Sequence, residues 1–506
     1  MVHTQKSVFK THLCNKCHIL CYIRNMNTPI ESFFWYDLET FGTDPFNDRI
    51  AQFAGMRTDT SLNPIGDPVM LYCRLSPDYI PNRSACEVTG ITPQTLKEKN
   101  ALPESEFIER INALFSVRGT CVVGFNNIKF DDEFIRNALY RNFMDPYERE
   151  YKNGCSRWDI INMVRACHDL RPEGIQWPHG KEDNRPVFRL TDLTEANKIE
   201  QIGAHDALVD VRATIAVAKL IKEKQPKLYE YYLGLRDKEN VRKVLGLGGP
   251  QVKPVLYTST AFSSVYGATS LIVPITPTTG MSNNIVCINL AKDPAPLIAA
   301  QGKDLENIVF GQDSVVVRVG VNKIPFVTPA NTIKESGYQR LGLDYRLCMQ
   351  HLETVISHMD ELVLKLRDIK FNDALQDNDP DTAIYSKFFS DYDKSLFRMI
   401  RRTEPARRLE LKLNFQDPRC EDMLWRHVCR NYPEILNEEQ LKRWKVFASS
   451  RLMSPPGGNI NIYLTEEVLE REIQNPETAQ RTKDIYKSLL SYLKAVRKYL
   501  GMKDRV

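Results

Sequence analysis

The stretch Ser32-Phe33-Phe34-Trp35-Tyr36-Asp37-Leu38-Glu39-Thr40 decides the fold of the N-terminal half of the chain. Its aromatic and apolar residues favour extended backbone, and Gly42 supplies a turn signal just beyond it, so the stretch predicts a strand. Asp37 and Glu39 are two residues apart, and side chains at that spacing emerge on one face of a strand. Taken alone, such a pair is more typical of a strand end with two solvated acids than of a functional site.

Strands and helices alternate after this first strand. Apolar runs bounded by turn residues predict strands at residues 50–57, 69–75 and 120–125. Apolar residues at steps of three and four predict amphipathic helices at residues 106–116 and 206–222. This alternation predicts an α/β domain over residues 32–224.

The sequence pattern changes after the glycines within residues 246–250. Short β-rich segments separated by Pro, Gly and Asn predict a small barrel or sandwich-like β domain, with strands at residues 255–257, 270–275, 285–290 and 314–318. Helical spacing returns at residues 346–369, and nearly everything after the polar break at 372–381 predicts an α-bundle. We therefore expect a β domain ending in a helix at residues 226–374 and an all-α domain at 376–506. Residues 1–31 are expected to be an extension that is disordered or lies upstream of a start at Met26.

The composition is that of an ordinary globular protein, because 42% of the 506 residues are hydrophobic and 26% are charged. Lys and Arg number 68 against 64 Asp and Glu, a net charge of +4. This charge is too small to mark a polyanion-binding protein by bulk electrostatics, so any basic surface must be local. No apolar run approaches the roughly 18 residues needed to cross a bilayer. Beyond residue 25 the cysteines are scattered singly, which favours reduced thiols in a cytoplasmic protein.

Further acidic groups follow at two places. Asp131 and Asp132 lie just past the strand predicted at residues 120–125, where loops of α/β folds place functional groups. Asp210 lies in the later amphipathic helix, a little over one turn after His205. Each of these residues, taken singly, is more typical of a capping or surface role than of catalysis. The residues themselves leave open whether Asp131 or Asp132 belongs with the first pair.

Taken in order, three patterns resemble the DEDD exonucleases of the histidine subtype: D-x-E on a first strand, Asn-x-x-x-Phe-Asp after a later strand, and His-x-x-x-x-Asp opening a later helix. The resemblance implies an RNase H-like mixed sheet and selects Asp131 over Asp132. It implies that four carboxylates hold two divalent ions, those of Asp37, Glu39, Asp131 and Asp210. It also implies that His205 takes a proton from water. Hard cations prefer oxygen ligands, so an all-carboxylate site suits Mg²⁺, with Mn²⁺ as a substitute.

This chemistry also stands on physical grounds. Phosphodiester hydrolysis needs a nucleophile and compensation for charge that builds on the phosphoryl and leaving oxygens, and two ions about 3.5 to 4 Å apart supply both. A histidine with an ordinary pKa near 6.5 accepts a proton near neutral pH, which suits His205 as the base.

Within that superfamily, the chain resembles the bacterial exodeoxyribonuclease I family. The shared motifs are Phe-Gly-Thr at 41–43, Glu-Val-Thr-Gly-Ile-Thr-Pro at 87–93, Gly-Phe-Asn-Asn at 124–127, Ser-Arg-Trp-Asp at 156–159, Leu-Arg-Pro-Glu-Gly-Ile at 170–175 and Ala-His-Asp-Ala at 204–207. In that family an SH3-like domain and a helical C-terminal domain follow the exonuclease domain. This order fits the β-rich and then helical sequence pattern of this chain. The resemblance implies an enzyme that degrades single-stranded DNA from the 3′ end and releases 5′-mononucleotides. It further implies a monomer that acts in DNA repair and recombination.

Basic and aromatic residues mingle between the second and third motifs. Aromatic faces stack bases without reading sequence, while Arg and Lys follow the backbone. Alignment with the family favours Arg136, Tyr147, Arg165 and Arg189 as DNA contacts, and Glu39 is also expected beside the substrate. For each basic or aromatic position the alternative is a solvated surface residue or a core tyrosine.

The resemblance also implies recruitment by the acidic C-terminal tail of the single-stranded DNA-binding protein. A pocket for such a tail needs an Arg for the terminal carboxylate and an apolar slot, and Arg171 and Tyr231 are candidates by position.

Two rival functions remain open at this point. An RNA-trimming or proofreading exonuclease would share the same site, but a stand-alone oligoribonuclease would lack the long segment after Lys224. A non-catalytic scaffold that binds single strands would gain nothing from clustering four acids.

Overall fold

The computed structural model describes residues 30–200, 206–247, 252–369, 371 and 379–503. The extension expected at residues 1–31 lies almost wholly outside the described residues, and so does His205. Within these ranges, no helix is both long and apolar enough to cross a membrane. The cysteines of the same ranges are all free and buried.

A five-stranded mixed sheet forms the centre of the first domain, in the order β3-β2-β1-β4-β5. Its strands are β1 (Ser32–Thr40), β2 (Ile50–Thr58), β3 (Val69–Tyr72), β4 (Thr120–Gly124) and β5 (Ser156–Asp159). The central strand β1 is antiparallel to β2 and parallel to β4. The mixed sheet expected from the resemblance is confirmed.

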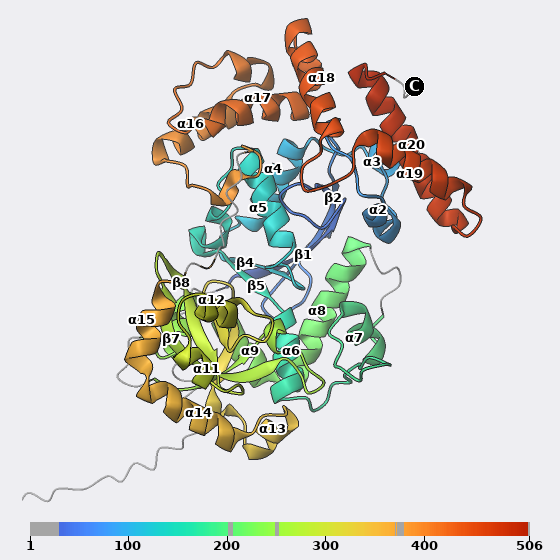
Figure 1. Cartoon of the computed structure of the whole chain (residues 1–506). Coiled ribbons are helices and arrows are strands. Elements are labelled where there is room, and N and C mark those ends of the chain that lie inside the picture. The colour runs from blue at the N-terminus through green and yellow to red at the C-terminus, as the bar shows by residue number, and fades with distance from the viewer. Residues whose placement is uncertain (1–29, 201–205, 248–251, 370, 372–378, 504–506) are drawn as a thin grey trace, which may run out of the picture.

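The alternation of side chains along β1 divides the core of this domain into two layers. Phe33 and Trp35 pack with α6 and α8 on one face, and Phe34 and Tyr36 pack with α4 and α5 on the other. Figure 1 shows these two pairs of helices on opposite sides of the sheet. Both faces are apolar because helices cover both, which explains the aromatic density of the opening strand. The helical segments of this domain are α2 (Arg83–Thr89), α3 (Pro93–Glu98), α4 (Glu104–Phe115), α5 (Asp131–Arg141), η1 (Glu148–Glu150), η2 (Lys152–Gly154), α6 (Ile161–Leu170), α7 (Leu190–Ala196) and α8 (Ala207–Lys224).

A second, antiparallel sheet follows, in the order β10-β6-β7-β8-β9. Its strands are β6 (Val255–Thr258), β7 (Thr269–Thr278), β8 (Met281–Asn289), β9 (Val316–Gly320) and β10 (Phe326–Pro329). The helical segments around it are α9 (Pro226–Gly234), α10 (Lys238–Val244), η3 (Thr260–Phe262), α11 (Ala295–Ala299), α12 (Gly302–Phe310), η4 (Ala330–Thr332), α13 (Glu335–Arg340), α14 (Tyr345–Ser357) and α15 (Met359–Arg367). The expected β-rich domain ending in helices is confirmed, and β10 is a strand that the sequence pattern did not reveal.

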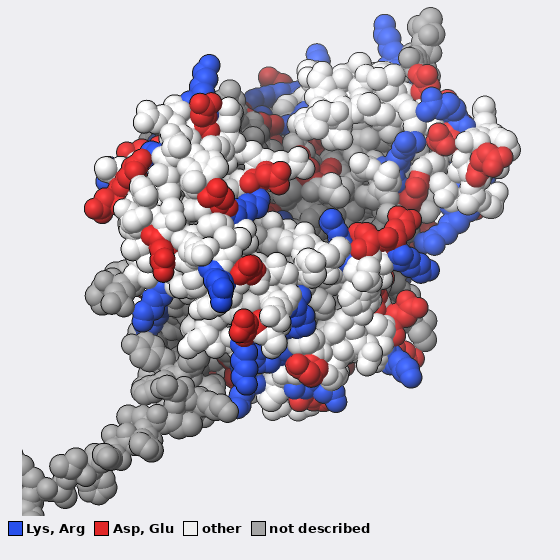
Figure 2. Space-filling model, turned by 60° about the horizontal axis from the view of Figure 1, so that its bottom comes forward, with Lys and Arg blue, Asp and Glu red and all other residues white. Residues whose placement is uncertain are grey.

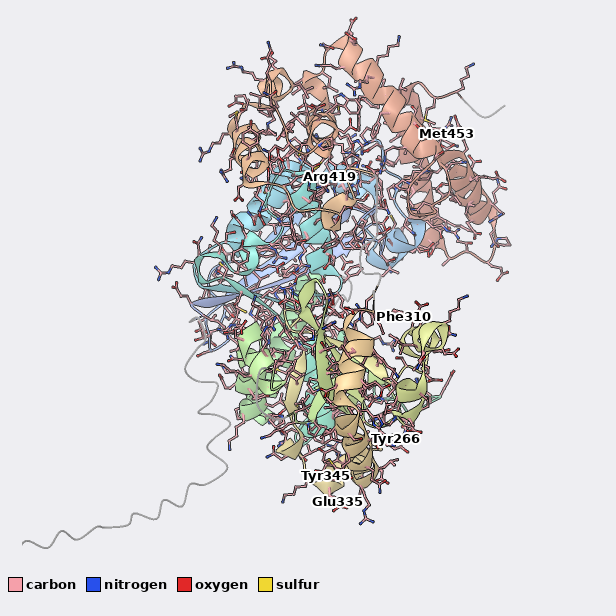
Figure 3. The ribbon with its side chains drawn as sticks, turned by 60° about the vertical axis from the view of Figure 1, so that its left-hand side comes forward. Tyr266, Phe310, Glu335, Tyr345, Arg419 and Met453 are labelled. Atoms are coloured by element: carbon pink, nitrogen blue, oxygen red, sulfur yellow. The ribbon has the colours of Figure 1, made fainter. Side chains whose placement is uncertain are left out.

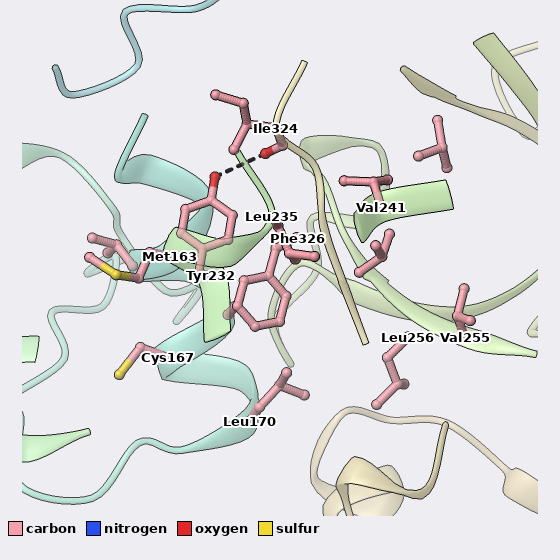
Figure 4. Close-up of a cluster of buried hydrophobic side chains, with 14 of the residues drawn as sticks. Met163, Cys167, Leu170, Tyr232, Leu235, Val241, Val255, Leu256, Ile324 and Phe326 are labelled. Carbon is pink, nitrogen blue, oxygen red and sulfur yellow. Dashed lines mark hydrogen bonds between the residues drawn. The ribbon is translucent and has the colours of Figure 1, made fainter. Parts of the chain in front are cut away.

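Helix α9 joins the two sheets into one continuous core. The hydroxyl of Tyr232 donates to the carbonyl oxygens of Asp159 in β5 (3.0 Å) and Ile324 (2.9 Å), and its ring stacks on Phe326 at 5.3 Å (Figure 4). Trp158 of β5 also contacts Tyr229 and Tyr232. The domain boundary predicted at residue 225 therefore lies where the cores of the exonuclease domain and the β-rich domain are continuous.

The C-terminal part is helical, as expected, and packs on the far side of the first domain. Its segments are η5 (Ala383–Tyr385), α16 (Asp391–Arg402), η6 (Pro405–Glu410), α17 (Arg419–Asn431), η7 (Pro433–Ile435), α18 (Glu438–Met453), α19 (Ile462–Gln474) and α20 (Gln480–Leu500). Apolar residues of α2 and α3 share a core with α20. The first domain thus lies between the other two (Figure 1), and the view in Figure 3 places Arg419 and Met453 in the helical part and Tyr266 and Tyr345 in the β-rich part.

Charges of both signs are interspersed over the surface that Figure 2 presents. This agrees with the small net charge of +4 and with the expectation that any attraction for a polyanion is local.

Candidate active site

Three carboxylates from two elements meet at one end of β1. Ligand atoms of Asp37, Glu39 and Asp210 all lie within 4.8 Å of one another. The two strand residues share the β1 face that α8 covers, since they alternate in step with Phe33 and Trp35. Asp206 caps α8 by accepting the amide of Leu208 at 3.0 Å. The cap fixes the start of the helix, and the first turn then carries Asp210 toward the strand pair.

Asp131 adds a fourth carboxylate next to these three, from α5 on the other side of the sheet. It is the first residue of α5 and is buried, with 5% of its surface exposed. Burial, followed by the charge of neighbouring Asp132, raises its pKa well above the usual range, while a backbone hydrogen bond from Leu38 of β1 opposes the shift. Burial and the charges of Asp131, Glu39 and Asp210, in that order, likewise raise the pKa of Asp37. The charges of these acids therefore act on one another.

The donor set fits a divalent metal ion. Burial and the charge of Asp210 raise the pKa of Glu39 to about 8, so bringing these acids together without a cation is unfavourable for their charged forms. All the donors are carboxylate oxygens, which Mg²⁺ and Mn²⁺ prefer. Asp37, Glu39, Asp131 and Asp210 would hold such ions.

Asp132 has a different environment from that of Asp131. It is fully buried, and its carboxylate accepts hydrogen bonds from Tyr36 Oη (2.7 Å), Arg149 Nη2 (2.8 Å) and Arg157 Nη1 (3.0 Å). Burial alone would raise the pKa of Asp132, but Arg149 and Arg157 hold it well below the usual range. A carboxylate already neutralised by two guanidinium groups is a poor metal ligand, which favours Asp131 as the member of the site.

Asp159 was not singled out as a site residue by the sequence pattern, although it holds the loop that leads to Asp131. Its carboxylate accepts the backbone amides of Asn126 (2.9 Å) and Ile128 (3.2 Å). Burial raises the pKa of Asp159 to about 6, against these hydrogen bonds. Gly124 permits the tight approach at the start of this loop, because a Cβ there would lie 2.7 Å from Cβ of Asn127. The available signal was the Ser-Arg-Trp-Asp motif, which ends at Asp159, whereas the strand β5 that carries it was not predicted.

Comparison with known proteins decides the family. The exodeoxyribonuclease I of Haemophilus influenzae is 40% identical over 434 residues, which cover 83% of this chain and 90% of the relative. The chain belongs to the exodeoxyribonuclease I family. The Escherichia coli member is 38% identical over 424 residues, covering 82% of this chain and 88% of the relative. The crystal structure of E. coli exonuclease I with a dA16 oligonucleotide has a TM-score of 0.86 at 34% identity, covering 92% of this chain and 100% of that chain.

Family models divide the chain as the fold does. The exonuclease model matches residues 34–218, the exonuclease I SH3-like domain model residues 236–371, and the exonuclease I C-terminal domain model residues 378–496. An exodeoxyribonuclease hydrolyses DNA, so the chain is an enzyme of the nuclease class. The family resemblance and the three-part architecture seen in the sequence are confirmed.

The structure places the expected DNA contacts of this exodeoxyribonuclease I family member in different environments. The Arg189 side chain is 75% exposed and pairs with Asp192 at 2.6 Å. Arg165 is half-buried, and its Nη1 donates to Asn162 at 3.1 Å. Tyr147 is half-buried. All three have surface that a strand could reach.

Arg136 does not fit the expected role. It is buried, and its guanidinium donates to Glu133 (Nη1, 2.7 Å) and to Glu150 (Nε, 2.9 Å; Nη2, 3.0 Å). Because every nitrogen of this group already donates to a carboxylate, we no longer expect Arg136 to contact DNA. The sequence did not reveal these partners, since Glu150 lies 14 positions away.

Arg171 and Tyr231 both donate to backbone carbonyls of one short segment of the SH3-like domain. Arg171 Nη2 donates to the carbonyl of Thr332 (2.9 Å), and Tyr231 Oη donates to that of Val327 (2.8 Å). The two residues that were chosen by position are thus brought to β10 and η4 of the SH3-like domain.

We expect the metal-free protein to lose thermal stability as the pH rises from about 5 to about 8, because the pKa of Glu39 is raised from 4.5 to about 8. In this window the folded state holds a proton that the unfolded state has released. The stabilisation is therefore complete below the unfolded pKa and is lost as the pH rises through the folded one. Added Mg²⁺ should restore stability most at high pH, since the cation replaces the protons.

Thermal melts across this pH range, with EDTA and with MgCl₂, measure the effect. Glu39→Gln is the matched control and should make the EDTA series less steep, while the raised pKa values of Asp37 and Asp131 keep some dependence on pH. A wild-type EDTA series that is flat, or that rises with pH, would contradict the assignment of raised carboxyl pKa values.

Proposed function

We propose that this exodeoxyribonuclease I family member is a Mg²⁺-dependent exonuclease that degrades single-stranded DNA in the 3′ to 5′ direction and releases 5′-mononucleotides. The observation that carries the proposal is the convergence of Asp37, Glu39 and Asp210 within 4.8 Å, beside buried Asp131. The E. coli relative has been solved with a dA16 oligonucleotide, and its complex with single-stranded DNA has been solved in a zinc-bound form.

The proposed reaction assigns each residue of the chain a task. Asp37, Glu39, Asp131 and Asp210 hold two divalent ions. When bound, the ions activate water and compensate the charge on the phosphoryl and leaving oxygens. His205, which lies outside the described residues, takes a proton from the attacking water. A new P–O bond forms, the bond from phosphorus to the 3′ oxygen of the preceding nucleotide breaks, and that oxygen takes a proton to become the new 3′ hydroxyl.

Substrate and partner contacts complete the proposal. Arg189, Arg165 and Tyr147 contact the strand, and Glu39 lies beside the terminal nucleotide. Arg171 and Tyr231 take the acidic tail of the single-stranded DNA-binding protein, in keeping with a crystal structure of SSB and exonuclease I with an inhibitor. We place the enzyme in the cytoplasm as a monomer that acts in DNA repair and recombination.

One assay tests the activity. We expect mononucleotides from 3′-labelled single strands at once, and from 5′-labelled strands only at the end of digestion, both only with Mg²⁺. Duplex DNA and RNA are the comparison substrates. Faster cleavage of RNA would favour the trimming alternative, and the absence of hydrolysis with any metal would favour the scaffold.

We expect Arg171→Ala to weaken binding of an acidic tail peptide by roughly 10- to 100-fold, because a hydrogen bond to a charged group is worth about 1.5 to 3 kcal/mol. Fluorescence anisotropy with a labelled peptide measures the loss. Arg185→Ala is the matched control, since the Arg185 side chain is 57% exposed and forms a surface ion pair with Asp183 at 3.5 Å. Equal affinities for the two variants would contradict the assignment, provided that both melt like the wild type.

A further inference from the structure

One loop of the exonuclease domain, residues 125–130, leads directly to the proposed metal ligand Asp131. It connects β4 to α5, whose first residue is Asp131. Within the loop, the backbone amides of Asn126 and Ile128 donate to the carboxylate of Asp159. We call residues 125–130 the Asp131 loop. The position of the Asp131 carboxylate therefore depends on what holds the two ends of this loop.

The SH3-like domain contacts the C-terminal end of the Asp131 loop through one arginine. Residues 321–325 join β9 to β10, and we call them the β9–β10 turn. The carbonyl oxygen of Asn322 in this turn accepts Nη2 of Arg157 at 3.1 Å. Nη1 of the same guanidinium donates to Asp132, the neighbour of Asp131, at 3.0 Å. Arg157 is buried, with 7% of its surface exposed, so water has little access to this connection.

The same turn also reaches the N-terminal end of the loop. The hydroxyl of Tyr232 lies 3.0 Å from the carbonyl oxygen of Asp159 and 2.9 Å from that of Ile324 in the β9–β10 turn, and Figure 4 shows the second of these bonds. The carboxylate of Asp159 accepts the loop amides, so Tyr232 holds the backbone of the residue that holds the loop. Arg157 and Asp159 both belong to β5, so both connections pass through one strand.

The backbone of the turn is strained at the residue that binds Tyr232. Ile324 has a φ of +49° and is buried, with 2% of its surface exposed. A β-branched residue rarely adopts this left-handed region, because its side chain crowds the backbone there. Residues persist in such conformations only where the surrounding structure fixes them, and they cluster at functional sites. The strain therefore falls on one of the two carbonyl groups that connect the turn to the Asp131 loop.

Apolar packing already joins the two domains at α9. Trp158 packs edge-to-face on Tyr229 at 5.3 Å between ring centres, and Phe326 stacks on Tyr232 at 5.3 Å. The hydroxyl of Tyr229 has no hydrogen-bond partner among the residues that the structure describes. Tyr229 therefore contributes to the domain contact through its ring, whereas Tyr232 adds a hydroxyl that connects the turn to Asp159. The two tyrosines allow the packing of the domains to be separated from the positioning of the loop.

We propose that the β9–β10 turn of the SH3-like domain positions the metal ligand Asp131, with Arg157 and Tyr232 as the positioning residues. The inference rests on the proposed function, which makes Asp131 a ligand. Removal of a group that orients a metal ligand through hydrogen bonds typically lowers metal affinity or activity by about 10- to 100-fold. The SH3-like domain then supports hydrolysis even of a substrate that is too short to reach it.

Tyr232→Phe in the full chain tests the proposal, with Tyr229→Phe as the matched control. At a temperature where both variants are folded, we expect Tyr232→Phe to weaken Mn²⁺ binding by roughly 10-fold or more, measured by electron paramagnetic resonance without substrate. Hydrolysis of the p-nitrophenyl ester of thymidine 5′-phosphate, which occupies only the carboxylate site, should fall to a similar degree and recover as Mn²⁺ is raised. Hydrogen exchange in EDTA should be faster in the Asp131 loop. Tyr229→Phe should match the wild type in all three measurements.

Arg157→Lys tests the other end of the loop. It keeps a positive charge beside Asp132, but an ammonium group does not span this carboxylate and the carbonyl of Asn322 as a planar guanidinium does. We expect a loss of Mn²⁺ affinity similar to that of Tyr232→Phe.

Equal Mn²⁺ affinities in Tyr232→Phe and Tyr229→Phe would overturn the proposal. Faster exchange of the Asp131 loop with unchanged Mn²⁺ affinity would also overturn it, because the loop would then move without displacing the ligand. Failure of the proposed function would appear separately, as wild-type protein that binds no Mn²⁺. In that case Asp131 would not be a ligand, and the positioning role would be wrong as well.

Discussion

Asp37→Ala is expected to lower hydrolysis by about 10³-fold or more, since the metal ions supply several kcal/mol of transition-state stabilisation. The same substitution should leave the melting temperature of the metal-free protein unchanged or raised. Burial and the neighbouring acids raise the pKa of Asp37 and of Asp131, so removing one carboxyl relieves an unfavourable environment. Asp210→Ala should behave alike. Single-turnover cleavage with Mg²⁺ and thermal melts in EDTA measure the two effects.

Asp132→Ala is the contrasting control one residue away from the proposed ligand Asp131. It removes the carboxylate that pairs with Arg149 and Arg157, and so leaves two buried guanidinium groups short of a partner. Breaking a buried ion pair in this way costs about 3 to 5 kcal/mol. The proposed ligand Asp131 should therefore be dispensable for folding, whereas Asp132 should not. A large drop in the melting temperature of Asp37→Ala would contradict the metal-ligand assignment.

Local pattern was enough to predict two of the elements that carry the site, but not α5, whose first residue is Asp131. The strand at β1 follows from its aromatic and apolar composition and the helix at α8 from periodicity, and the spacing of Asp37 and Glu39 fixes their shared face. The resemblance then supplied what periodicity does not contain, namely which distant acids belong together.

Other parts of the structure depend on pairs that are remote in sequence. Nothing local in the sequence shows that Arg149 pairs with Asp132, or that Glu150 accepts the hydrogen bonds of Arg136. Arginines and acids are abundant, and the tertiary fold decides which of them pair. The same limit explains why the sequence predicted a domain boundary near residue 225, where the structure has continuous packing. The sequence around residue 225 does not show that Tyr232 would donate to carbonyls in both neighbouring domains.

One buried ionic cluster links the helical domain to the exonuclease domain and to the connecting segment. Arg430 of α17 donates from Nε to Asp78 of the exonuclease domain (2.9 Å) and from Nη2 to Asp381 of the connecting segment (2.7 Å). Burial alone would raise the pKa of Asp381, but Arg430, followed by Arg426, holds it well below the usual range. One guanidinium thus ties the helical domain both to the exonuclease domain and to the chain arriving from the SH3-like domain.

Arg430→Ala is therefore expected to destabilise the docked C-terminal domain by about 3 to 5 kcal/mol, because Asp78 and Asp381 stay buried with less compensation. Hydrogen exchange should show the loosening first in α17 to α20, ahead of global unfolding. Arg407→Ala is the control, since Arg407 is 77% exposed in its pair with Glu410 and a surface pair contributes at most about 1 kcal/mol.

The functional consequence follows from how little bulk attraction the enzyme has for its substrate. With a net charge of +4, we expect the protein to retain a strand by local contacts and by enclosing it between docked domains. A loosened helical domain raises the off-rate without touching the carboxylates. Arg430→Ala should then cleave short oligonucleotides at the wild-type rate but stop early on a long strand when excess unlabelled trap prevents rebinding. Wild-type run lengths in a variant whose C-terminal helices exchange freely would show that domain docking does not retain the strand, and would leave retention to local contacts.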